Sequence, residues 1–111
     1  MNEKKVLKII LKELNFEQVK EVIDILEWYV KWVNRTGKDT LTAKYMFING
    51  YKNINDFVEK TKLPAHRCDT TLGQAIAHNT NNIKSYFKLK EILEIDDDDF
   101  IEILKEVGNN E

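Results

Sequence analysis

The chain has 111 residues, of which 42% are hydrophobic and 32% charged, and its formal net charge at pH 7 is −2. This length suits one domain with one modest core, and a single proline with four glycines disfavours many-stranded sheets and long loops. No apolar run approaches the roughly 18 residues of a membrane span, the N-terminus does not read as a signal peptide, and the lone Cys68 cannot form an internal disulfide. We therefore expect a single cytoplasmic all-α domain, a compact bundle of five to six helices.

The first 36 residues predict a helical hairpin. Residues 3–14 form an amphipathic helix, one side of which we expect in the core. Its apolar face consists of Val6, Leu7, Ile10, Leu11 and Leu14. Residues 16–33 predict a second helix whose apolar positions cover about 220° of its circumference. Such a helix either crosses the centre of the domain or shares its surplus face with a second subunit. In the second case Trp28, Tyr29 and Trp32 would form the dimer contact.

The clearest break in the chain is at Gly37, which is placed to end a helix, with Asp39 or Thr40 placed to cap the next one. Residues 41–48 have apolar positions at helical spacing, although so short a run can also form a strand. We favour a helix, because Asn49-Gly50 supplies a stop and no partner strand is available. Residues 39–107 would then hold the remaining helices.

Residues 54–73 carry a pattern that indicates a function. Two short apolar stripes at helical spacing are separated by a three-residue turn at 61–63. Asn53 can cap the first helix, and Pro64 can start the second. Two helices that meet at a tight corner are what a helix-turn-helix needs. The sequence INDFVEKTKLPAHRCDTTL resembles the helix-turn-helix of bacterial repressors of the LacI and Xre kinds, over about a fifth of the chain.

This resemblance implies a recognition helix that starts at Pro64 and enters the DNA major groove. The apolar positions that begin at Cys68 should point inward, which leaves His66, Thr70, Gly73 and Ala77 on the outer face. Small side chains there would let the helix approach the bases closely. The candidate DNA-binding residues are Lys62, Ala65, His66, Arg67, Asp69, Thr70, Gln74 and Lys84.

Several of these candidates have specific partners on DNA. His66 and Thr70 can meet base edges, Arg67 can pair with guanine or a phosphate, and Gln74 can pair with adenine. Asp69 repels phosphate unless it accepts from cytosine or caps locally. Taken singly, each side chain is more often an ordinary surface residue, so the hypothesis rests on the set.

The end of the chain predicts two more helices, at 83–93 and at 97–107 after a cap at Asp96. Phe100, Ile101, Ile103 and Leu104 should pack inward. The run KLKEILEIDDDDFIEIL also resembles the closing helices of Xre-type domains.

Charge is distributed unevenly along the chain. Residues 1–51 carry +2, residues 52–90 carry +4 and residues 91–111 carry −8. The positive middle coincides with the helix-turn-helix pattern, as phosphate binding requires, although a solvated face is the simpler reading of any one lysine. The acidic run at 96–99 also has a local explanation, because carboxylates at a helix N-terminus offset the helix dipole.

Catalysis finds little support in the sequence. His66 and Cys68 face different directions on a helix, and His66 with Asp69 lacks the further ligands of a zinc site. We expect no enzyme activity, no metal and no cofactor.

Two classes of function remain. The first is a small repressor-like regulator that binds double-stranded DNA as a homodimer. The second is a non-catalytic protein-binding inhibitor or adaptor of phage type, which uses its aromatic helix or its acidic tail against a protein partner.

Overall fold

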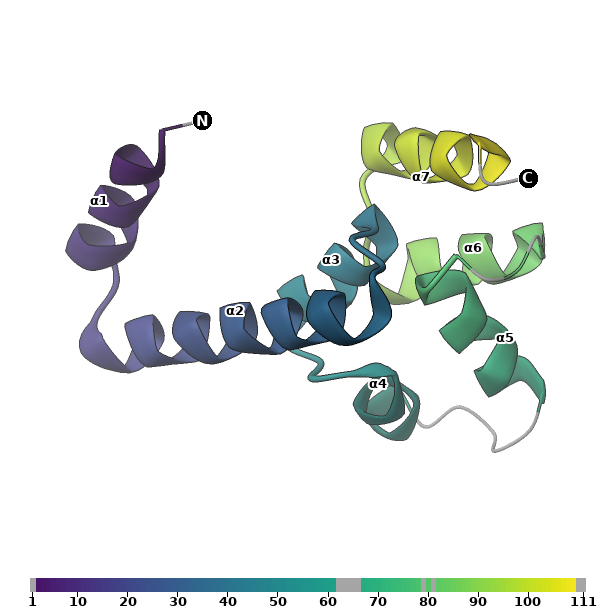
Figure 1. Ribbon diagram of the computed structural model, residues 1–111, viewed down its shortest axis with the longest axis horizontal. Helices are drawn as coiled ribbons and strands as arrows, with labels where there is room; N and C mark the ends of the chain where they lie inside the picture. Colours follow the sequence, from purple (N-terminus) through teal and green to yellow (C-terminus); the bar gives the residue numbers. More distant parts are fainter. Residues whose placement is uncertain (1, 62–66, 79, 81, 110–111) are drawn as a thin grey trace.

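The computed structural model describes residues 2–61, 67–78, 80 and 82–109, and it describes their side chains except at 67–71 and 109. The described part contains helices and no strand (Figure 1). The helices are α1 (Glu3–Glu13), α2 (Phe16–Thr36), α3 (Leu41–Ile48), α4 (Ile54–Thr61), α5 (Arg67–Ile76), α6 (Ile83–Ile92) and α7 (Asp97–Asn109). The all-α prediction is confirmed, with seven helices in the described part instead of five to six.

Local capping chemistry sets most helix ends. Gly37 adopts φ 69° and ends α2, as predicted, because only glycine takes the left-handed conformation without strain. Thr40, one of two candidate caps, accepts a hydrogen bond from the Ala43 N–H and starts α3. Residues 41–48 are therefore helical, which confirms the choice of helix over strand. Asn53 accepts from the Asp56 N–H at 2.8 Å and caps α4.

The core is built around α3, which packs against α2, α5 and α7, while α5 also packs against α4 and α6. Five of the eight residues of α3 are buried, whereas Lys44 and Ile48 are exposed along one strip of the helix. A helix that is buried over most of its circumference needs apolar or internally bonded side chains on those sides. The buried residues of α3 are Thr42, Ala43, Tyr45, Met46 and Phe47.

The N-terminal part of the chain projects from this core. Figure 1 shows α2 extending away from the C-terminal helices, with α1 turning off at its far end. No residue of α1 is buried, and Trp32 is the one fully buried residue of α2. The prediction that one side of residues 3–14 joins the core is therefore wrong, because α1 turns away at the end of α2 that lies far from the core (Figure 1). Residues 3–30 are called the arm below.

The last helix buries a narrower face than predicted. Phe100, Ile103 and Val107 are buried and recur at spacings of three and four residues, whereas Ile101 is 51% exposed. Ile101 lies about 100° around the helix from Phe100 and so falls outside this face. The prediction that Ile101 packs inward is wrong.

Candidate functional site

The predicted DNA-binding residues fall into three groups. Lys62, Ala65 and His66 lie outside the described residues. Three others, Arg67, Asp69 and Thr70, lie in the first turn of α5, and their side chains are outside the described set. Gln74 is exposed on α5, and Lys84 is exposed in the first turn of α6. The helix-turn-helix therefore stays a prediction, since its turn falls where the structure gives no description.

The second half of α5 is buried on more than one side. From Leu72 to Ala77, Gln74 alone is exposed. Gly73 and Ala77, which were predicted to face outward, are both buried, and Ala77 is 7% exposed. A Cβ atom added at Gly73 would lie 2.9 Å from Ile54 Cγ2. The prediction of an outward face there is wrong, because α3, α4 and α6 together surround this part of α5.

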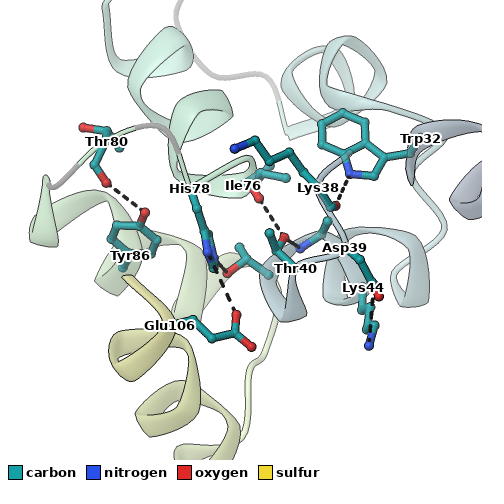
Figure 2. Close-up of polar contacts among 12 residues, drawn as sticks. Trp32, Lys38, Asp39, Thr40, Lys44, Ile76, His78, Thr80, Tyr86 and Glu106 are labelled. Carbon is teal, nitrogen blue, oxygen red and sulfur yellow. Dashed lines mark hydrogen bonds and ion pairs between the residues drawn. The ribbon is translucent and has the colours of Figure 1, made fainter. Parts of the chain in front are cut away.

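A polar network joins the end of α5 to α3 and α7 (Figure 2). The Thr40 hydroxyl donates to the Ile76 carbonyl at 3.0 Å while it accepts from the Ala43 N–H. Thr42 Oγ1 lies 3.0 Å from His78 Nε2, and His78 Nδ1 lies 3.9 Å from Glu106 Oε2. Thr40 thus caps two helices, and Thr42 holds the His78 ring in place.

The order hydroxyl, imidazole, carboxylate is that of a catalytic triad, but the burial argues against catalysis. Thr42 is 0% exposed, and the His78 side chain is 3% exposed. A substrate has no access to a hydroxyl that is fully covered. His78 also has φ 57°, a strained conformation for a non-glycine residue, and its ring packs edge-on against Tyr86 at 5.9 Å. We interpret the network as structural, because it fixes the position of the C-terminal end of α5.

Protonation of His78 should weaken this network and lower the stability of the folded chain. Burial, with a smaller contribution from the charge of Lys38, lowers the pKa of His78 from its usual 6.5. The groups near the ring are Thr42, Tyr86, Glu106 and Lys38, and the pKa is lowered although the Glu106 carboxylate lies 3.9 Å away. The unfolded chain binds this proton at higher pH than the folded chain. The stabilisation is therefore complete above pH 6.5 and is lost as the pH falls from 6.5 toward the folded pKa.

Melting temperatures measured between about pH 7 and about pH 5 test this prediction. Wild type should lose stability more steeply over that interval than His78→Gln, in which the titrating group is absent. Equal slopes in the two proteins would contradict it.

The three aromatic residues predicted at a dimer contact have different environments. Trp32 is 4% exposed, donates its Nε1–H to the Lys38 carbonyl at 3.1 Å, and meets Phe47 edge-on at 6.2 Å. It is a core residue with little surface left for a dimer contact. Tyr29 is partly buried against Phe47, and burial with a hydrogen bond to Asp39 raises its pKa to about 12. Trp28 is partly buried as well.

Most of the exposed large apolar side chains that the structure describes lie instead on the arm. Seven of the eleven exposed large hydrophobic side chains among the described residues belong to it. They are Leu7, Ile9, Leu11, Phe16, Ile23, Leu26 and Val30. Ile23, Leu26 and Val30 line a shallow depression of about 370 Å³ on α2. The sequence interpretation missed this surface.

The spacing of the apolar residues on α2 indicates this surface in the sequence. Phe16, Val19, Ile23, Leu26 and Val30 follow one another at alternating intervals of three and four residues. This is the spacing of the two apolar positions in a coiled-coil heptad, and it places all five side chains along one stripe of the helix. We call these five residues the seam. The seam lies on a different side of α2 from Trp32.

Comparison with protein-family models, with curated proteins and with solved structures found no match to this chain. Among the described residues, no group of three or more His, Cys, Asp or Glu side chains is placed to hold a metal ion. No helix in the same part of the chain is both long and apolar enough to cross a membrane.

Proposed function

We propose that this chain is a non-catalytic protein-interaction module that assembles as a homodimer through its arm. The observation that carries the proposal is the seam, whose residues Phe16, Ile23, Leu26 and Val30 are between 48% and 73% exposed. Monomeric proteins rarely expose so many large apolar side chains in one contiguous patch. A stripe of this period is complementary to another helix that carries the same stripe.

A second copy of α2 in antiparallel orientation can bury the seam. A two-fold axis between Ile23 and Leu26 places Ile23 of each copy against Leu26 of the other, with Val19 against Val30 in the next layers. The same axis brings Lys20 of one copy near Glu27 of its partner, so that opposite charges flank the apolar layers. Burying one half-exposed aliphatic side chain contributes about 1 kcal/mol, and every seam contact occurs twice in a symmetric pair.

The mass of the chain in solution tests the proposal. Light scattering over a range of concentrations should give twice the monomer mass of 13.1 kDa, with dissociation on dilution. A mass of 13.1 kDa at every concentration would exclude the homodimer.

A DNA-binding regulator remains the second candidate, because residues 52–90 carry +4 and expose Lys84, Lys88 and Gln74. Two other lysines of this segment already have partners: Lys60 pairs with Asp56 at 3.3 Å and Lys90 with Asp97 at 2.8 Å. The homodimer would present two copies of this surface to one duplex.

Salt-dependent binding to duplex DNA tests this second function. A regulator should bind duplex DNA. In the double variant Lys84→Gln/Lys88→Gln, the slope of the log binding constant against the log salt concentration should become shallower by about 1 for each lost phosphate contact. A dimer that shows no binding at low salt would leave protein interaction as the proposed function.

A further inference from the structure

A groove of about 630 Å³ lies where the last turns of α2 meet the segment that precedes α4. Its lining residues are Trp28, Lys31, Trp32, Asn34, Arg35, Lys52 and Asn53. Three of the seven are cations, two are amides and none is a carboxylate. Grooves of this size accommodate small-molecule ligands, and this one has the charge of a site for an anion.

Two of the cations are held in place by the tryptophans. Lys52 Nζ lies 5.5 Å from the centre of the Trp28 ring, and Arg35 Cζ lies 5.6 Å from the centre of the Trp32 ring. The Trp32 ring is itself fixed, because its Nε1–H bonds the Lys38 carbonyl. A cation attracted to a ring face keeps N–H donors that point away from the ring. Both cations therefore line the groove with their charged groups beside a tryptophan ring.

The remaining polar groups complete a set of donors. Lys31 lies four residues before Arg35 and so projects from the same side of α2. Asn53 uses its carbonyl oxygen to accept from the Asp56 N–H at 2.8 Å, which leaves its amide N–H groups as donors. The nearby Asp56 carboxylate accepts a hydrogen bond from the backbone N–H of Lys52 at 2.9 Å and pairs with the Lys60 ammonium at 3.3 Å. Its charge is thus offset in part by Lys60, which does not line the groove.

We infer that this groove binds the phosphate group of a nucleotide or of a nucleic acid strand. A phosphate presents several acceptor oxygens to a guanidinium fork, to ammonium groups and to amide donors together. The groove shares only Lys31 with the seam depression. Arg35 and Lys52 can therefore be changed without altering the seam.

Intrinsic fluorescence provides the test, because Trp28 and Trp32 are the two tryptophans of the chain and both line the groove. Tripolyphosphate, ATP and a short single-stranded oligonucleotide are titrated into the full chain, with binding confirmed by calorimetry. At least one should give a saturable change. Arg35→Gln and Lys52→Gln should each weaken that binding at least tenfold at an unchanged melting temperature.

The matched control is Lys105→Gln, which removes an exposed cation from α7, far from the groove in the chain. It should bind as wild type does. Preference for ATP over the oligonucleotide would identify a free nucleotide as the ligand, and the opposite preference would identify a strand. The inference is overturned if none of the three probes binds saturably, if a polyglutamate peptide binds in their place, or if Lys105→Gln weakens binding as much as Arg35→Gln.

Discussion

Leu26→Glu is expected to convert the dimer into a folded monomer, with the dissociation constant raised at least 100-fold. Leu26 is 53% exposed in its own chain, so that replacing it does not disturb the core. In the antiparallel pair it lies at the centre of the seam, against Ile23 of the second copy. A carboxylate buried there without a partner costs several kcal/mol, and the two-fold axis introduces it twice.

The matched control is Ile101→Glu, because Ile101 is 51% exposed and lies on α7, outside the seam. Sedimentation of both variants should give a monomer for Leu26→Glu and a dimer for Ile101→Glu. The orientation of the pair can be tested in the same way. Lys20→Glu should weaken the dimer, and adding Glu27→Lys should restore it. A dimer that survives Leu26→Glu would place the contact elsewhere on the chain.

Local chemistry explains which features of the fold were predictable. Gly37, Thr40 and Asn53 act on the backbone within a few residues, so their roles as a helix stop and as two caps follow from the sequence. Whether a helix is surrounded depends on what packs against it from elsewhere in the chain. For α5, helical periodicity indicated one buried face, and the sequence contained no sign that α4 covers Gly73 as well.

The prediction for the arm was limited in a similar way, because the sequence does not show which apolar side of α2 joins the core. The apolar width of residues 16–33 correctly indicated a helix with more than one apolar side, but the sides were assigned by residue type. Tryptophan is favoured at protein interfaces, which pointed to Trp32. The structure instead buries Trp32 in the core and exposes the aliphatic seam. Heptad spacing along α2 would have been a better guide, since it specifies the geometry of a contact and not only its composition.

Gly73→Val is expected to destabilise the fold by about 3 kcal/mol, near the upper end for overpacking a core. Its Cβ would lie 2.9 Å from Ile54 Cγ2, and the branched methyl groups would extend further into α4. An outward-facing Gly73 would behave in the opposite way, because valine has a higher helix propensity than glycine and would stabilise α5 by a few tenths of a kcal/mol. The sign of the change therefore reports which way this half of α5 faces.

Equilibrium denaturation at one fixed protein concentration measures the effect, since the stability of a dimer depends on concentration. Gln74→Val is the control on the same helix; Gln74 is exposed, so the change should stay within about 0.5 kcal/mol. Ile54→Ala combined with Gly73→Val should recover part of the loss by making room for the new side chain. If Gly73→Val proved neutral or stabilising, this half of α5 would face solvent. It would then be free to enter a major groove, and the order of the two proposed functions would be reversed.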